Sequence, residues 1–143
     1  MSIEEENEKI IRLVFEELGK GNLEVIDEYF SEDFKRYASD GQEMDKDGYK
    51  QFGKMLLNRF TDFHITIEDM VAEGDKLAFR FTWTGKDNSD IMDGSLKGKS
   101  FSITEDYFCL IKDGKILEFK NLHDRLSRFE QAGITPPIGE GNK

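Results

Sequence analysis

Two titratable side chains stand side by side near the end of the chain, where KILEFKNLHDRLSRF changes from a strand pattern to a helical one. His123 exchanges a proton near neutral pH, and the carboxyl of Asp124 can act as general acid or base. Against an apolar pocket the charged form of a carboxyl is disfavoured, so Asp124 would keep its proton to higher pH. The pair therefore indicates acid–base chemistry, with Asp124 and His123 as candidate catalytic residues.

Asp124 also suits a purely structural role. It directly precedes RLSRFEQAG, a helical pattern, and aspartate is a favoured N-cap that accepts a hydrogen bond from a backbone N–H. Neighbouring strand residues point to opposite faces, so His123 and Asp124 reach one pocket only if the strand ends between them. The sequence does not decide between a capping role and a catalytic role for Asp124, and one residue could fill both.

A second carboxylate candidate lies in the segment TED, residues 104–106. Glu105 and Asp106 face opposite sides of the predicted strand, so one of them approaches either the cavity or the dimer surface. Asp106 shares its side with Phe108 and Leu110, and we therefore expect Asp106 to be the buried polar group near the pocket.

Three further residues are candidates for the pocket wall. Phe81 and Trp83 are two residues apart and share a face, which is typical of core packing but also suits a flat ligand. His64 begins a predicted strand, either as an exposed residue or as a pocket group. Cys109 lies in an apolar run without a nearby cation and is expected to be an inert core thiol.

Composition excludes several classes of function. With 143 residues, 37% of them hydrophobic, the chain suits one domain with its own core. Its 30 acidic and 20 basic residues give a net charge of -10, which disfavours nucleic-acid and membrane partners. One cysteine, two histidines and no phosphate-binding glycine loop predict no disulfide, no metal and no cofactor. Without a secretion signal or membrane-length apolar run, we expect a cytoplasmic protein.

Helical periodicity dominates the first part of the chain. Ser2 and Glu5 fit a capping box before a helix predicted over 3–19, and GKGN ends that helix. A short second helix precedes SEDF, and apolar residues at helical spacing predict a third over 47–60. These helices would supply one layer of the fold.

Alternating patterns then predict strands. Two runs meet around EGD, two more meet at the turn DG of residues 113–114, and residues 85–97 form a polar loop. Helices followed by antiparallel strands predict an α+β domain in which a curved sheet wraps around the N-terminal helices. We expect this domain to span 1–134, with a last short helix, and 135–143 to be a tail.

Three segments resemble one family. The opening NEKIIRLVFEELGKGNLEVIDEYFSEDF, the middle FTDFHITIEDMVAEGDKLAFRFTWTG and the close DGKILEFKNLHDRLSRFEQAG are similar, in this order, to the SnoaL-like polyketide cyclases. The resemblance spans about residues 7–134. It implies the nuclear-transport-factor-2-like cone with an apolar pocket, activity without metal or organic cofactor, and a homodimer formed through the sheet.

The same resemblance assigns roles to individual residues. Asp124 matches the family aspartate that moves a proton between a carbon acid and a carbonyl oxygen during aldol ring closure. Tyr37 stands where many relatives place a cavity histidine, and its phenol would donate to a ligand carbonyl; the alternative is a core or surface tyrosine. Asn121 stands where relatives often carry an acid, and Lys120 replaces a common tryptophan, so this chain departs from the family pattern at both positions.

The sequence thus favours a cofactor-independent cyclase or isomerase acting on a flat, apolar carbonyl compound. Two alternatives use the same fold: a protein that binds a small hydrophobic ligand without reacting it, and a dimeric association module whose pocket is filled by its own aromatic residues. A pocket without space for a ligand would favour the association module. A pocket whose carboxyl has no hydrogen-bond donor within reach would favour binding over catalysis.

Overall fold

In the computed structural model, which describes residues 1–123 and 125–133, the chain starts with helix α1, Ile3–Gly19. The Ser2 hydroxyl accepts a hydrogen bond from the Glu5 backbone N–H, and the Glu5 carboxylate accepts one from the Ser2 N–H, so the predicted capping box is present. Ile11, Val14 and Phe15 are buried on one face of the helix. The predicted first helix is confirmed.

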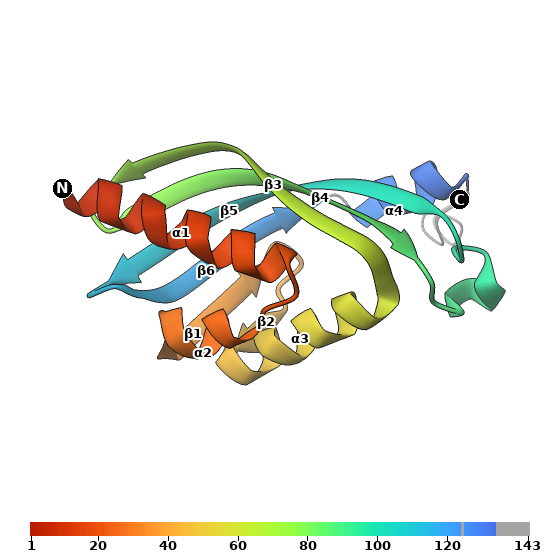
Figure 1. Cartoon of the computed structure of the whole chain (residues 1–143), viewed down its shortest axis with the longest axis horizontal. Helices are drawn as coiled ribbons and strands as arrows, with labels where there is room; N and C mark the ends of the chain where they lie inside the picture. Colours follow the sequence, from red (N-terminus) through yellow and green to blue (C-terminus); the bar gives the residue numbers. More distant parts are fainter. Residues whose placement is uncertain (124, 134–143) are drawn as a thin grey trace.

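Two shorter helices follow on the same side of the molecule (Figure 1). Helix α2 is Glu24–Tyr29, and helix α3 is Lys46–Arg59, within one residue of the prediction at each end. The Asp45 carboxylate caps α3 by accepting a hydrogen bond of 2.8 Å from the Gly48 N–H. Tyr49 is the one buried residue of α3, whereas α1 has four, so α3 covers the sheet less tightly than α1 does.

The sheet has six strands in the order β2-β1-β6-β5-β4-β3. Four long antiparallel strands form most of it: β3 Phe60–Glu73, β4 Lys76–Asp87, β5 Ser100–Lys112 and β6 Lys115–His123. Asp113 and Gly114 between β5 and β6 both have positive φ, 50° and 75°, as a tight two-residue hairpin turn requires. The predicted hairpins are confirmed.

The strands β1, Phe30–Ala38, and β2, Glu43–Asp45, were not predicted. Strand β1 pairs parallel with β6, so the sheet is mixed rather than wholly antiparallel. An irregularity in register between Phe30 and Lys35, and a buried arginine at 36, obscure the alternation of this strand in the sequence. The predicted loop 85–97 contains the end of β4 and a short 3₁₀ helix, Ile91–Gly94.

Helix α4, Arg125–Ala132, follows β6 and lies beside β5. The Gln131 side chain accepts a hydrogen bond from the Ser102 N–H and donates one to the Ser102 carbonyl oxygen, both of 2.8 Å. The predicted tail, 135–143, lies outside the described residues.

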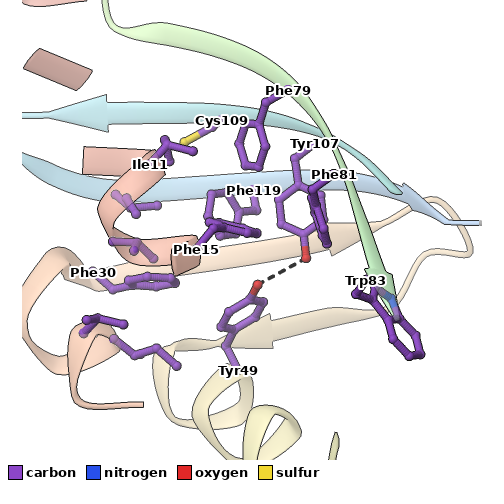
Figure 2. Packing of buried hydrophobic residues seen from close by; sticks show 14 of the residues in the cluster. Ile11, Phe15, Phe30, Tyr49, Phe79, Phe81, Trp83, Tyr107, Cys109 and Phe119 are labelled. Atoms are coloured by element: carbon purple, nitrogen blue, oxygen red, sulfur yellow. Dashed lines mark hydrogen bonds between the residues drawn. The ribbon is translucent and has the colours of Figure 1, made fainter. Parts of the chain in front are cut away.

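Aromatic rings from the helix layer and the sheet meet in the core (Figure 2). The ring of Phe15 on α1 packs edge-on against Phe79, Tyr107 and Phe119 of three different strands, with centroids 5.1 to 6.1 Å apart. This packing fixes α1 on the sheet and leaves α3 to close the remaining space. None of the helices in the described ranges is both long and apolar enough to cross a membrane.

Candidate functional site

An apolar cavity of about 70 Å³ lies between the first three helices and the sheet. Aliphatic and aromatic side chains form most of its wall, and its polar groups are one carboxylate, two phenols and one indole N–H. The lining residues are Phe15, Leu18, Leu23, Ile26, Tyr49, Phe52, Gly53, Leu56, Leu57, Phe63, Ile65, Phe81, Trp83, Glu105 and Tyr107.

Glu105 on β5 supplies the carboxylate. Its Oε2 accepts a hydrogen bond of 2.8 Å from the Trp83 indole Nε1–H on β4, and its Oε1 accepts one of 3.4 Å from the Asn121 amide on β6. Trp83 and Asn121 are both buried. Donors to both oxygens of Glu105 stabilise its ionised form, which is the form that can accept a proton from a bound molecule.

Asn121 connects Glu105 to a buried cation. The Asn121 Oδ1 accepts a hydrogen bond of 3.0 Å from Nη1 of Arg36 on β1. Because a guanidinium only donates, this contact fixes the amide with its oxygen toward Arg36 and its nitrogen toward Glu105. The ring of Phe52, which lines the cavity, lies 5.6 Å from the Arg36 guanidinium carbon.

Two phenols meet in the cavity wall. The hydroxyls of Tyr49 on α3 and Tyr107 on β5 are 3.1 Å apart, and either can be the donor (Figure 2). Burial raises the pKa of both phenols, so both stay protonated. Their mutual hydrogen bond uses one of two hydroxyl protons, which leaves a second O–H able to donate to a ligand.

The cavity is small for a polycyclic ligand, because sites for small molecules commonly measure about 300 to 1,000 Å³. Its wall toward α3 consists of half-buried residues, among them Phe52, Leu56 and Phe63. A Cβ added at Gly53 of α3 would lie 3.0 Å from the Leu23 side chain, so α3 approaches this part of the chain closely. A larger ligand therefore requires these side chains to move apart.

The predicted pocket residues are only partly brought together. Phe81 and Trp83 line the cavity as expected, and Asn121 lies directly behind its carboxylate. Asp106 does not line it: its side chain lies on the opposite face of the sheet, 43% exposed, where Arg80 holds it in an ion pair of 2.7 Å. The expectation that Asp106 is the buried carboxylate is wrong, and Glu105 takes that place.

Two other candidates lie away from this cavity. Tyr37 is half-buried and alternates on β1 with the buried Arg36, so it points to the other face of the sheet and is not a lining residue. His64 is exposed and borders a surface groove between α1 and β3.

The candidate catalytic residue His123 is the last residue of β6, and its backbone pairs with Glu105. Asp124 lies outside the described residues, so its roles as acid–base group and as helix cap stay predictions.

Glu105 carried a signal in the sequence that would have identified it. Residues 101, 103, 107, 109 and 111 of its strand are all apolar, and all are buried, whereas the other parity includes Ser102, Thr104 and Lys112. Glu105 belongs to the apolar set and therefore faces inward. Tyr49 belongs to the apolar residues at helical spacing that predicted the third helix. Arg36 had no comparable signal, because its inward direction depends on a strand that was not predicted.

Within residues 1–123 and 125–133 no group of three or more His, Cys, Asp or Glu side chains is arranged to hold a metal ion.

Comparison with solved structures supports the assignment of the fold. IdmH of Streptomyces antibioticus, a proposed polyketide cyclase, superposes with a TM-score of 0.80 over 89% of this chain and 98% of its own, at 23% identity. A proposed polyketide cyclase of Acidithiobacillus ferrooxidans gives 0.77 over 93% and 98%, at 25% identity. A Catenulispora acidiphila protein with a ketosteroid isomerase-like fold gives 0.72 over 88% and 93%, at 15% identity. The predicted nuclear-transport-factor-2-like fold is confirmed.

Comparison of sequences gives the family. No curated protein sequence matches the chain significantly. The family profile described as SnoaL-like polyketide cyclase matches residues 9–132, which include all the elements that build the cavity. The chain therefore belongs to the SnoaL-like polyketide cyclase family.

Proposed function

We propose that this protein is a cofactor-independent cyclase or isomerase that moves protons on a flat, apolar carbonyl compound held in the cavity. The observation that supports this most directly is a carboxylate, Glu105, in the same apolar wall as a phenol pair with an unused O–H. A base for a carbon acid and a donor for the resulting oxyanion are the two groups that enolisation needs.

The proposed reaction begins when Glu105 removes a proton from the carbon next to a carbonyl group. The electrons of that C–H bond form an enolate, whose oxygen accepts the hydrogen bond from the Tyr49–Tyr107 pair. Return of the proton to another carbon gives an isomer, while attack of the enolate carbon on a second carbonyl carbon closes a ring, and the new alkoxide takes the proton. Asp124 and His123 are the further candidates for this proton return, as the family resemblance implies.

The aromatic wall suits a planar substrate. Phe63 and Phe60 pack against Trp83 with centroid distances of 5.6 and 5.0 Å, and Phe81 lies deeper along the same strand. Flat ring systems stack on such faces. The charge of -10 makes a neutral substrate more suitable than an anionic one.

The proposal is tested by exchange of α-protons into heavy water, which needs no knowledge of the natural substrate. With 2-tetralone as probe, NMR should show exchange accelerated by the protein, and Glu105→Gln should remove at least about 90% of the acceleration. The matched control is Asp106→Asn, the neighbouring acid on the opposite face, which should keep full activity. Equal exchange in wild type and Glu105→Gln would contradict the proposal.

Binding without turnover is the second candidate function, and the small cavity favours it. In that case 2-tetralone or a related aryl ketone quenches the fluorescence of Trp83, the single tryptophan of the chain, but its α-protons exchange no faster than in buffer.

We also propose that the outer face of the sheet forms a homodimer. Val71, Ala78 and Phe108 lie in one row across three strands, and Phe108 is 68% exposed, an unusual degree for so large an apolar side chain. Gel filtration should give about twice 16.6 kDa. Phe108→Glu should yield monomer, whereas Leu13→Glu, at an exposed leucine on α1, should leave the dimer intact; a monomeric wild type would refute the dimer.

A further inference from the structure

Arg36 is a buried cation with few acceptors around it. It is 5% exposed, its Nη1 donates to Asn121 and its Nη2 to the weakly accepting Met44 sulfur at 3.0 Å. In the described part of the chain its Nε has no hydrogen-bond acceptor, and none of the ion pairs there includes Arg36. Its positive charge is therefore not neutralised by an adjacent acid of these residues.

The one strong acceptor of Arg36 is also a donor to Glu105. The chain of contacts runs from Nη1 of Arg36 to Oδ1 of Asn121 at 3.0 Å, and from Nδ2 of Asn121 to Oε1 of Glu105 at 3.4 Å. Hydrogen bonds in series polarise one another, so the cation strengthens the amide as a donor to the carboxylate. Three strands, β1, β6 and β5, hold the three residues in this order.

Three other side chains described near Glu105 are uncharged. Tyr49 on α3 and Tyr107 on β5 are neutral phenols in the same cavity wall, and Trp83 on β4 donates an uncharged N–H. His123 on β6 pairs with Glu105 through the backbone. Arg36 contributes a permanent positive charge, which Asn121 links to this carboxylate.

We propose that Arg36 is a positioning residue that acts through Asn121 to orient Glu105 and hold it in its ionised, proton-accepting form. The inference rests on the proposed role of Glu105 as the base. It also gives a reason for the amide at 121, where the family resemblance predicted an acid. An aspartate there would accept from Arg36 but, when ionised, could not donate to Glu105, and two adjacent carboxylates would share a proton.

The indole of Trp83 offers a direct readout of this coupling. It is the single tryptophan, so its Nε1–H gives one unambiguous NMR signal, and it donates to Glu105 at 2.8 Å. The chemical shift of this signal should titrate with the ionisation of Glu105, and Glu105→Gln should abolish the titration. A titration that persists in Glu105→Gln would belong to another group and would overturn the reporter and the inference together.

In Arg36→Met the midpoint of the indole titration should move to higher pH by about one unit, because a nearby positive charge favours the carboxylate. Asn121→Leu removes the amide between Arg36 and Glu105 but keeps the guanidinium, and it should also move the midpoint to higher pH. The matched control is Arg80→Met, which removes the same charge from the outer face of the sheet, where Arg80 pairs with Asp106. Its midpoint should stay within about 0.2 units of wild type, as screening of exposed charges predicts.

An unchanged midpoint in Arg36→Met, or an equal movement in Arg80→Met, would overturn the positioning role. If Arg36→Met does not fold, Arg36→Gln decides, since it keeps a donor to Asn121 and removes the charge; an unchanged midpoint there overturns the proposal. These titrations use the protein without substrate. If the exchange assay with 2-tetralone fails, the catalytic proposal is lost, but the coupling between Arg36 and Glu105 measured by titration still stands. If exchange is accelerated but the midpoint in Arg36→Met is unchanged, only the positioning role of Arg36 is lost.

Discussion

The paired phenols of Tyr49 and Tyr107 provide the sharpest test of the geometry around the cavity. They are 8% and 5% exposed, and their hydroxyls are 3.1 Å apart. Replacing Tyr107 by Phe leaves the buried Tyr49 hydroxyl without its partner, which costs about 1 to 3 kcal/mol. We therefore expect Tyr107→Phe to lower the free energy of unfolding by about 2 kcal/mol.

The double variant makes the prediction specific. With both hydroxyls removed, no buried donor is left unpaired, so Tyr49→Phe/Tyr107→Phe should be destabilised by no more than either single variant, about 2 kcal/mol, instead of the sum of about 4 kcal/mol. Urea unfolding followed by Trp83 fluorescence measures all four corners of this cycle. Additive costs, or single variants within about 0.5 kcal/mol of wild type, would show that the two hydroxyls do not share a buried hydrogen bond.

The remaining predictions concern Asp87, the buried thiol and phenols, and Gly53. Asp87→Asn should destabilise by about 3 kcal/mol, measured by urea unfolding, because it leaves Arg59, 2.8 Å away, without its buried partner. Burial opposes the charge of Asp87, but hydrogen bonds from Arg59 and Ser89 outweigh it and lower its pKa, so its stabilising contribution should be present above about pH 4 and lost as the pH falls further. Burial raises the pKa of Cys109 and of the two phenols, so the folded chain binds more protons than the unfolded one and melting temperature should fall with pH from about pH 9 upward; a flat profile to pH 11 would contradict it. Gly53→Ala should gain up to about 1 kcal/mol from helix propensity yet weaken 2-tetralone binding, because the new methyl group pushes Leu23 into the cavity.

Most of the fold could be predicted from periodicity. Local features predict the capping box at Ser2, helices α1 and α3, and the turn at 113–114. Each of these elements depends on residues that are close together in the sequence, and each is found where it was predicted. Strand β1 could not be predicted in this way. Its ladder partner β6 is about 85 residues away, as the contact between Arg36 and Asn121 shows, and its inward positions include a cation instead of a hydrophobic residue.

The candidate site was less predictable because it depends on which face of each strand is covered. Asp106 and Glu105 were correctly placed on opposite faces, but Asp106 was favoured because it shares its face with Phe108 and Leu110, and Phe108 is itself largely exposed. The outer face of this sheet also carries apolar side chains, so an apolar neighbour does not by itself identify the inner face. The alternation over the whole strand, rather than these two neighbours, selects Glu105.

Gly53 affects how a ligand can enter the cavity. Glycine in a helix interior weakens the helix by about 1 kcal/mol relative to alanine, and this one lies in α3 over the cavity. Both ends of α3 are fastened, by the Asp45 cap and by the pair of Arg59 with Asp87, so the middle turn is where the helix can bow. If α3 bends at its middle turn while its two ends stay attached, the opening above the cavity is narrow. It would admit thin, flat molecules far more readily than bulky ones.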